Sequence, residues 1–509
     1  MGFFDKVKKA FGSKKEDVEY QNSVNDEIID KPESVERMEN DDTLNENKDI
    51  QSEDLEETFV NDIIDKPTHN DKIRSFKYLD DLIHCGTKKI VLDSDIVLDS
   101  EDKSEEIKLD VDDLVIDGNG HTIDAQGLTR IFYCTGKKVV IKNIILKNAF
   151  AESCGAIYNM GDLTIIDSIL IGNAAQRDGG AIYNAGELTV SDSTLTGNTA
   201  NHDGGAIYNS RGNLTIIDSI LTGNTANHHG GAIHNYKEEL TIAESTFTGN
   251  TAEYGGAIYK DGGELTVSES TFAGNTAEYG GAIRNGGGEL TVSESTFVGN
   301  AAQRDGGSIY NVDGEITITS STFAENTAKH YGGAIYSLRC DLTITSSTFT
   351  ENTAQRWEGL QGSGGAIYNF KAELTVSDST FMGNTAQGFG GAINHFKGEL
   401  TITSSTLTEN TSQENGGAIY NGIGNFKIFN CEFSNNKSPN NIILNNDFLQ
   451  IHNAIFKDNQ SKFIVLNDGD EANLGIFHGE FSENNVEESV LCNTGKFCSV
   501  EKTVFQNNI

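Results

Sequence analysis

Proline is almost missing from this chain of 509 residues, which contains only three. Pro32, Pro67 and Pro439 all lie outside the central stretch of the chain, residues 149–436. Proline has no backbone N–H to donate to a neighbouring strand, so interior strands of a sheet exclude it. The absence of proline from residues 149–436 is therefore what we expect if this stretch is built from paired strands.

Cysteine is sparse as well. The seven cysteines are an odd number at irregular spacings, which argues against a disulfide framework. We therefore expect Cys431, which lies in the repeat described below, to be a buried thiol. The composition by itself favours neither an oxidising nor a reducing compartment.

Basic residues are outnumbered two to one. The chain has 38 Lys and Arg against 76 Asp and Glu, a formal net charge of −38. Recognition of phosphates needs clusters of Lys and Arg, so we expect no nucleic-acid partner. No apolar run approaches the roughly 20 residues of a membrane-spanning helix. No continuous apolar segment of the secretory type follows the first lysines either.

Residues 1–15, MGFFDKVKKAFGSKK, place Phe3, Val7 and Phe11 four residues apart among five lysines. This pattern predicts a short basic amphipathic helix. Such a helix can rest on an anionic membrane surface, which would give the chain a peripheral membrane contact. The alternative is a frayed tail, because so short a helix is marginally stable alone.

What the chain has in abundance is a repeat of 25 or 26 residues, exemplified by residues 255–277, GGAIYKDGGELTVSESTFAGNTA. An aromatic residue or leucine followed three residues later by asparagine keeps the same period and continues beyond the array. Fixed-period similarity indicates stacked units that cannot bury an apolar face alone. The isoleucine of the GGAI motif occurs in eleven copies, at Ile157, Ile182, Ile207, Ile233, Ile258, Ile283, Ile309, Ile335, Ile367, Ile393 and Ile419.

The composition of the unit favours strands. Leu265 and Val267 alternate with polar residues, which is the period of two that a half-buried strand shows. Ser270 and Phe272 alternate with the opposite parity, so the chain turns a corner between the two pairs. Three short strands and three corners per unit describe an all-β fold, a right-handed parallel β-helix of about 16 coils. We expect Asn275 and its equivalents to form an internal ladder of amides.

The rest of the chain is organised around this array. The acidic segment that follows the first 15 residues has few large apolar side chains and cannot bury enough surface to fold. From Ser75, a plausible N-cap, the apolar spacing predicts a helix that closes the end of the rod. In order, we predict a basic amphipathic helix (1–15), a disordered acidic linker (16–74), a capping helix with the first coils (75–148), the GGAI/FxxN array (149–436) and degenerate coils (437–509).

Two columns are expected on the outside of the rod. An acidic column, Asp167 and its equivalents, is either a row of solvated charges or a weak surface calcium site. Beside the inward isoleucine is a column of tyrosines, interrupted by His234, Arg284 and Asn394. We predict that it is exposed and stacks on a sugar or a protein, although a ladder that stiffens the face is the alternative. Its members are Tyr158, Tyr183, Tyr208, Tyr259, Tyr310, Tyr336, Tyr368 and Tyr420.

The loops between the asparagine and GG vary most, and one of them, residues 354–363, is longer by about six residues. It contains the only tryptophan of the chain. Together with neighbouring loops and tyrosines it predicts a ligand-binding aromatic patch; a tolerated surface insertion is the alternative. The predicted ligand-binding residues are Trp357, Arg356, Glu358, Tyr331, His330, Phe389, Tyr336 and Tyr368.

No catalytic residues or cofactor are predicted. The insertion offers Glu358 and Arg356 but no convincing catalytic pair. Successive loops also carry four metal-ligating residues, and stacking of the coils would bring them within reach of one another. They match no fixed ligand motif, so we assign no metal site and regard them only as weak candidates. These residues are His202, Asp203, His228 and His229.

The signatures GGAIYN and FTGN resemble the GGAI/FxxN repeats of the polymorphic outer-membrane protein family. The first coil, DGNGHTIDAQG, and the helix before it are similar to archaeal adhesin-like right-handed β-helix proteins. The resemblance implies a cell-surface or extracellular protein with an adhesive role. We therefore expect a non-enzymatic scaffold that binds a glycan or a protein. The alternatives are a polysaccharide lyase or glycoside hydrolase on the same fold, and an intracellular structural protein of the cytoplasm.

Overall fold

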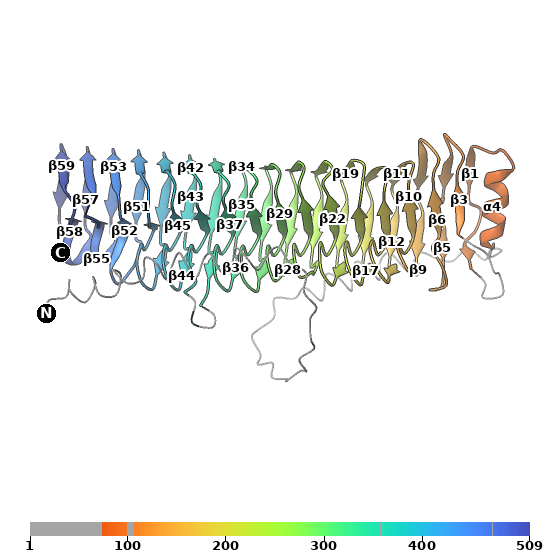
Figure 1. The fold of residues 1–509 in the computed structure, drawn as a ribbon, viewed down its shortest axis with the longest axis horizontal. Helices are drawn as coiled ribbons and strands as arrows, with labels where there is room; N and C mark the ends of the chain where they lie inside the picture. Colours follow the sequence, from red (N-terminus) through yellow and green to blue (C-terminus); the bar gives the residue numbers. More distant parts are fainter. Residues whose placement is uncertain (1–73, 99–105, 357–358, 360, 471) are drawn as a thin grey trace. The chain divides into compact units, whose positions relative to one another are not determined.

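The computed structural model describes residues 74–98, 106–356, 359, 361–470 and 472–509. The amphipathic helix predicted at residues 1–15 and the linker up to residue 73 lie outside the described residues, as do Trp357 and Glu358. The described residues from 74 to 509 form a parallel β-solenoid in which strands pair with their equivalents in the neighbouring coils (Figure 1). The predicted all-β fold of about 16 coils is confirmed.

One coil of the array shows how the repeat folds. It consists of β25 (Ile258–Asp261), β26 (Leu265–Ser268) and β27 (Thr271–Ala273), followed by the two-residue strand β28 (Thr276–Ala277). Buried and more accessible residues alternate along the first three strands, and the predicted change of parity falls at the corner between β26 and β27. The two-residue strand was not predicted. Its alanine is buried and its threonine is exposed.

The first face is a sheet of 16 strands that carries the GGAI isoleucines. We call it the isoleucine sheet. Its strands are β3 (Ile107–Leu109), β6 (Phe132–Cys134), β10 (Ile157–Asn159), β14 (Ile182–Asn184), β18 (Ile207–Asn209), β22 (Ile233–Tyr236), β25, β29 (Ile283–Gly286), β33 (Ile309–Val312), β37 (Ile335–Leu338), β41 (Ile367–Phe370), β45 (Ile393–Phe396), β49 (Ile419–Asn421), β52 (Asn441–Asn445), β55 (Gln460–Asn467) and β58 (Asn485–Asn493).

The second face is a sheet of 17 strands. Its inward residues are mostly leucine, isoleucine and valine. Its strands are β1 (Lys89–Val91), β4 (Val115–Asp117), β7 (Val139–Lys142), β11 (Asp162–Ile166), β15 (Glu187–Ser191), β19 (Leu214–Ile217), β23 (Leu240–Ala243), β26, β30 (Leu290–Ser293), β34 (Ile316–Thr319), β38 (Leu342–Thr345), β42 (Leu374–Ser377), β46 (Leu400–Thr403), β50 (Phe426–Phe429), β53 (Phe448–His452), β56 (Asn473–Phe477) and β59 (Phe497–Glu501).

The third face buries the aromatic or leucine residue of the FxxN motif. Phe272 and Phe297, for example, stack with ring centroids 4.7 Å apart. Its strands are β2 (Ile96–Val97), β5 (Thr122–Asp124), β8 (Ile145–Lys147), β12 (Ile169–Ile171), β16 (Thr194–Thr196), β20 (Ile220–Thr222), β24 (Thr246–Thr248), β27, β31 (Thr296–Val298), β35 (Thr322–Ala324), β39 (Thr348–Thr350), β43 (Thr380–Met382), β47 (Thr406–Thr408), β51 (Glu432–Ser434), β54 (Ile455–Lys457), β57 (Glu480–Ser482) and β60 (Val504–Gln506).

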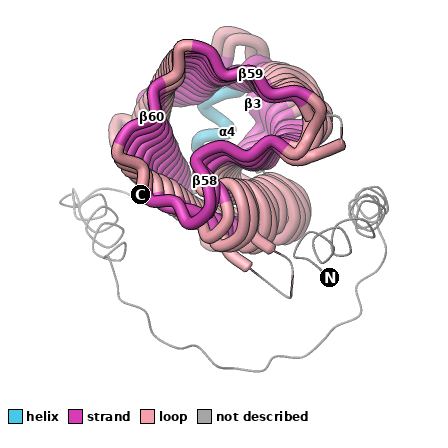
Figure 2. The backbone as a smooth tube through the Cα atoms, turned by 90° about the vertical axis from the view of Figure 1, so that its left-hand side faces the viewer, coloured by secondary structure: helices cyan, strands magenta, loops and turns pink. Residues whose placement is uncertain are grey.

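Two-residue strands follow this third face in most coils of the array. After each of them the chain loops back to the next GG pair. Viewed along the rod, these loops form a narrower stack that runs beside the tube (Figure 2). The strands are β9 (Phe150–Ala151), β13 (Ala174–Ala175), β17 (Thr199–Ala200), β21 (Thr225–Ala226), β28, β32 (Ala301–Ala302), β36 (Thr327–Ala328), β40 (Thr353–Ala354), β44 (Thr385–Ala386) and β48 (Thr411–Ser412).

Helix α4 (Phe76–His84) closes the N-terminal end of the rod, as predicted (Figures 1 and 2). Ser75 caps it, because its side-chain oxygen accepts a hydrogen bond from the backbone N–H of Tyr78. Phe76, Leu79 and Ile83 are buried in the core that the first coils begin. Among the described residues no helix is both long enough and apolar enough to cross a membrane.

The predicted asparagine ladder is present. Both the backbone N–H and the side-chain amide of Asn275 donate to Oδ1 of Asn300 at 3.0 Å, and the same amide also donates to the carbonyl oxygen of Phe247. The pattern repeats from coil to coil, so these fully buried amides are hydrogen-bonded. Cys431 is only 3 % exposed and unpaired, which confirms the prediction of a buried thiol.

A second asparagine ladder, which was not predicted, lines the isoleucine sheet. Asn159 donates to Asn184, which donates to Asn209, each at 2.6 Å. Lys260, Ser337 and His395 occupy the same column and interrupt the ladder. In the coil after each interruption, the asparagine oxygen has no hydrogen-bond partner, and these three oxygens belong to Asn285, Asn369 and Asn421.

Both positions of the GG pair require glycine, because backbone carbonyl oxygens lie where a Cβ atom would be. Gly204 has φ +64°, and a Cβ atom there would lie 2.3 Å from the carbonyl oxygen of Ile207. A Cβ atom on Gly205 would lie 2.0 Å from the carbonyl oxygen of Gly231 in the next coil. Only glycine fits both positions, so the motif fixes the point where the loop rejoins the sheet.

The acidic column lies at the corner between the second and third faces. Its seven members are exposed and adopt positive φ, from 46° to 50°. Their backbone conformation is the left-handed one, which Asp tolerates better than most residues. The calcium site at this column stays a prediction. The members are Asp167, Asp192, Asp218, Glu244, Glu269, Glu294 and Asp378.

Candidate functional sites

The tyrosine column is not exposed, which corrects our prediction. Tyr310 and Tyr368 are 4 % and 7 % exposed, and the other members are half-buried. The tyrosines do point out of the isoleucine sheet, but the returning loops cover them. On this face, a side chain that points away from the sheet is therefore not exposed to solvent, because the loops lie over it.

We call the residues immediately before the GG pairs the loop column, and its aromatic members provide this cover. Their rings pack on the tyrosine of the following coil: Tyr331 lies 4.5 Å from Tyr368, and Phe389 lies 5.0 Å from Tyr420, between ring centroids. The column comprises Asp178, Asp203, His229, Tyr254, Tyr279, Asp305, Tyr331, Ser363, Phe389 and Asn415.

Four residues of the predicted aromatic patch do come together, but as a small second core. Tyr336 stacks on Tyr368 at 5.5 Å, and both contact Tyr331. His330 is 4 % exposed, and burial lowers its pKa to about 4. His330 and Tyr368 are buried and Tyr331 and Tyr336 are half-buried, so these rings do not form an exposed surface. That they bind a ligand stays a prediction.

The remaining patch residues lie farther along the rod. Phe389 packs one coil beyond, on Tyr420. Arg356 keeps half of its side chain exposed and bonds Glu414 at 3.3 Å and, through its backbone N–H, the side chain of Gln387. These contacts hold the base of the long loop against the two following coils.

Asp305 is enclosed where the loop column meets the small second core. Only 14 % of its side chain is exposed. One carboxylate oxygen accepts a hydrogen bond from the backbone N–H of Tyr331 at 3.1 Å and lies 3.8 Å from Nδ1 of His330. Burial raises the pKa of Asp305 to about 7, against the opposing effects of that hydrogen bond and of Arg304.

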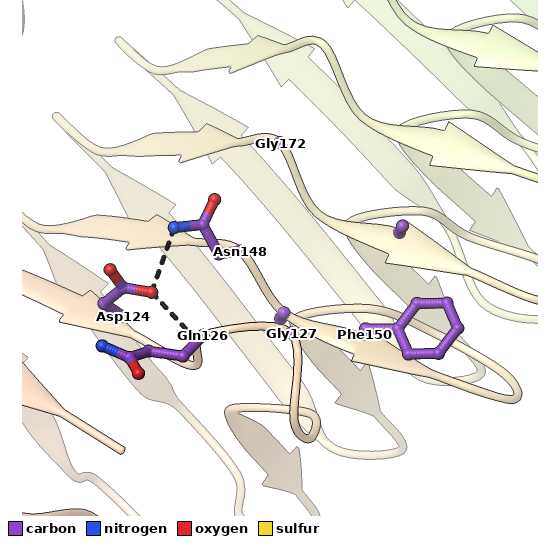
Figure 3. Close-up of a pocket in the computed structure, with 8 residues that line it drawn as sticks. Asp124, Gln126, Gly127, Asn148, Phe150 and Gly172 are labelled. Atoms are coloured by element: carbon purple, nitrogen blue, oxygen red, sulfur yellow. Dashed lines mark hydrogen bonds between the residues drawn. The ribbon is translucent and has the colours of Figure 1, made fainter. Parts of the chain in front are cut away.

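A groove with a volume of about 560 Å³ opens near the N-terminal end of the array, where the loop stack begins (Figure 3). Phe150, at the start of β9, is 40 % exposed there. In the view of Figure 3, Gly127 lies between this ring and the side chains of Gln126 and Asn148. The lining residues are Asp124, Gln126, Gly127, Asn148, Ala149, Phe150, Gly172 and Ala174.

Hydrogen bonds fix the polar wall of the groove. Oδ1 of Asp124 accepts from the side-chain amide of Asn148 at 3.1 Å and from the backbone N–H of Gln126 at 2.9 Å. Its other oxygen lies 3.3 Å from Nζ of Lys147. The amides of Gln126 and Asn148 are themselves exposed, so they can bond a ligand.

Sequence reasoning missed the groove, although a signal was present. Phe150 pairs with Ala174, which pairs with Thr199, so a phenylalanine stands where the following coils have small residues. Gly127 follows β5, one coil before Phe150, and a Cβ atom there would meet nothing within 4 Å. The groove is therefore open because its lining includes the small residues Gly127, Ala149, Gly172 and Ala174.

The structure brings together only two of the four weak metal candidates. Asp203 and His229 lie in successive loops, with Oδ1 of Asp203 2.8 Å from Nδ1 of His229. His234, on β22, joins them: its Nδ1 lies 3.2 Å from Oδ2 of Asp203. His202 and His228 are exposed and pack edge-on against each other outside this group.

The charge state of the group follows from burial and contacts. Burial opposes ionisation of Asp203, but its contacts with His229 and His234 outweigh that effect and hold the pKa of the carboxyl below its ordinary value. Burial lowers the pKa of His234, against the attraction of Asp203. Near neutral pH Asp203 is therefore a carboxylate that lies against the buried imidazole of His234.

Comparison with known proteins agrees with the repeat and the fold. The family model described as the right-handed beta helix region matches residues 230–406. The Chlamydia polymorphic membrane protein repeat matches residues 167–185, 192–210, 218–236 and 404–422. The chain is thus a right-handed parallel β-helix protein with polymorphic membrane protein repeats, as its GGAI and FxxN motifs predicted.

The similar solved structures are remote. A PL6 family alginate lyase, AlyGC, is 10 % identical, with 86 % of this chain and 89 % of that chain covered and a TM-score of 0.31. The A-module of the mannuronan C-5 epimerase AlgE6 from Azotobacter vinelandii is 11 % identical, with 87 % and 98 % covered and a TM-score of 0.21. These likenesses carry no argument about activity. No curated protein sequence matches the chain.

Proposed function

We propose that this protein is a non-enzymatic, cell-surface binding scaffold that recognises a glycan in the groove beside Phe150. The observation that carries the proposal is the combination in one groove of an exposed aromatic ring, two exposed amides, and only glycine and alanine among the other uncharged lining residues. The match to polymorphic membrane protein repeats supports the surface location.

The groove has the chemistry that a sugar ring needs. The C–H face of a sugar packs on an aromatic ring such as Phe150, and hydroxyl groups bond amides such as those of Gln126 and Asn148. A volume of about 560 Å³ lies within the range of small-molecule sites, roughly 300–1,000 Å³. The amide of Asn148 is already oriented by Asp124, so little order is lost on binding.

The rod beneath the groove makes it rigid. β5, β8 and β12 stack in register under its polar wall, and β9 pairs with β13 under Phe150. Sites built on paired strands hold their geometry better than sites on free loops. Variation among the loops farther along the array then gives room for additional contacts to a long ligand.

The test is a glycan array probed with the full chain and with Phe150→Thr. Thr occupies the equivalent position in β17, so the variant should fold. We expect about tenfold weaker binding of the best glycan, which corresponds to loss of one ring contact. Met382→Thr is the matched control, because Met382 is 39 % exposed and pairs with Thr350 and Thr408. Equal binding by the control and the Phe150 variant, or no binding by the wild type, would refute the proposal.

The long loop provides a second arm of the experiment. Trp357→Ala tests whether residues 354–363 contribute to the ligand site, as their aromatic content predicts. Loss of glycan binding in Trp357→Ala, together with full binding in Phe150→Thr, would move the site to the loop and away from the groove. The opposite result supports the groove and leaves the loop as a surface insertion.

A further inference from the structure

We propose that Asp203, His229 and His234 bind one divalent transition-metal ion, with Zn²⁺ as the reference ion. The site joins the loop column to the isoleucine sheet. It is separate from the groove beside Phe150 and does not depend on glycan binding.

The three residues converge from different segments. Asp203 and His229 each stand immediately before a GG pair, in successive loops, and a β-bridge joins their backbones. His234 stands in the tyrosine column on β22. One ligand atom from each residue lies within 4.8 Å of those from the other two. The stacking of the coils therefore assembles a carboxylate and two imidazoles around one point.

The His234 ring is turned out of its column. Tyr158 and Tyr183 stack with 7° between their ring planes, whereas His234 stands at 84° to Tyr208 and at 74° to Tyr259. This orientation directs Nδ1 of His234 to within 3.2 Å of Asp203. The ring thus leaves the tyrosine ladder and faces the carboxylate.

The two ring nitrogens of His234 are buried and have no hydrogen-bond partner. Its ring is 6 % exposed, and neither of its nitrogens makes a hydrogen bond; the Nδ1 contact with Asp203 falls outside hydrogen-bond geometry. A buried polar group without a partner costs free energy, and native proteins avoid it. The hydrogen bond between Asp203 and His229 gives each of those two side chains a partner, but it gives none to the buried ring of His234. A metal ion bound by Nδ1 would provide a partner for one of these nitrogens.

The ligand set selects the class of ion. Two imidazole nitrogens and one carboxylate oxygen suit Zn²⁺ and its neighbours in the first transition series, whereas Ca²⁺ and Mg²⁺ prefer oxygen ligands. Ligands about 2.0–2.2 Å from a tetrahedral Zn²⁺ are about 3.3 Å apart. The observed separations are 2.8 Å from Oδ1 of Asp203 to His229 and 3.2 Å from Oδ2 of Asp203 to His234, so each carboxylate oxygen faces one imidazole at a comparable distance.

The site stays accessible on one side. The side chains of Asp203 and His229 are 20 % and 33 % exposed, and that of His234 is 7 % exposed. Three protein ligands leave a fourth position of the tetrahedron for water or another small ligand. Tyr254 and Tyr259, both in the following coil, pack against His229 with ring centroids 5.4 Å and 4.3 Å away.

The test is calorimetric titration of Zn²⁺ into the full chain at pH 7, after chelator treatment and removal of any polyhistidine tag. We expect one Zn²⁺ per chain. His234→Tyr and His229→Tyr should each weaken binding at least about 100-fold, since loss of even an outer contact of a metal ligand costs about 10–100-fold. Both variants should fold, because Tyr259 and Tyr254 occupy the equivalent positions in the next coil.

His228→Asn is the matched control, because it removes an exposed neighbouring histidine from outside the group. Unchanged Zn²⁺ binding in the control, with loss in the two tyrosine variants, supports the proposal. Wild-type affinity in His234→Tyr, no Zn²⁺ binding by the wild type, or loss only in His228→Asn would overturn it. Co²⁺ provides a second readout, since a four-coordinate site gives it strong visible absorption that His234→Tyr must abolish.

Discussion

Lys260 is one of the three residues that interrupt the second asparagine ladder. It is fully buried in a column that is otherwise mostly asparagine, and its Nζ donates to the carbonyl oxygen of Gly262. It leaves Oδ1 of Asn285 without a hydrogen-bond partner. We predict that Lys260→Asn stabilises the coils around it, because the new side chain can accept from Asn235 and donate to Asn285.

The size of the effect follows from the charge and the hydrogen bonds. Burial lowers the pKa of Lys260 to about 8, from 10.5. At about 1.4 kcal/mol per pKa unit, a charged Lys260 costs the folded state about 3 kcal/mol at most. Two restored amide hydrogen bonds add about 1 kcal/mol each, partly offset by lost packing of the lysine stem. We therefore expect a stabilisation of roughly 3 kcal/mol at pH 7.

The pH dependence gives an independent check of the sign. Because the folded-state pKa of Lys260 lies below its unfolded value, the penalty is complete below pH 8 and disappears as the pH rises to 10.5. The advantage of Lys260→Asn should therefore shrink between these two values. The part due to hydrogen bonds should remain.

Hydrogen exchange measured by mass spectrometry is the appropriate assay, because a solenoid opens locally and does not unfold in one step. Peptides that cover β22, β25 and β29 should exchange about 100-fold more slowly in Lys260→Asn at pH 7. Lys137→Asn, an exposed lysine, is the control and should change nothing. Faster exchange in Lys260→Asn, or an equal change in both variants, would refute the reasoning.

Two further predictions concern other buried positions. Burial raises the pKa of Asp305 to about 7, so the wild type should lose up to about 4 kcal/mol of stability as the pH rises from about 4 to 7. Asp305→Asn, which copies Asn415 of the same column, should not lose stability over this range. Equal pH dependence of exchange around β33 in both proteins would contradict this. Phe297→Ala removes one ring from the interior stack and should cost about 3–5 kcal/mol, seen as faster exchange in β31 and its two neighbours and not at the ends of the rod.

The fold was predictable because the repeat leaves few alternatives. The parity change between Val267 and Ser270 located a corner, and the constant spacing of Phe272 and Asn275 located the interior columns. The second ladder was also visible, since an asparagine follows the tyrosine in GGAIYN. Its breaks, such as Lys260, conceal its regularity in the sequence.

The candidate sites were harder to predict because they depend on where the loops return. Spacing along the chain does not show whether Asp203 and His229, or the preceding His202 and His228, face the sheet. His234 was visible only as an interruption of the tyrosine column. The packing of the loop column on the tyrosines was also hard to predict, because the residues of that column change type from coil to coil.

The most direct test of the proposed function is a crystal structure of the full chain with the glycan that it binds best. The account predicts a sugar ring packed on Phe150, with hydroxyl groups hydrogen-bonded to the side chains of Gln126 and Asn148. A sugar bound elsewhere on the rod, with the groove beside Phe150 empty, would contradict it.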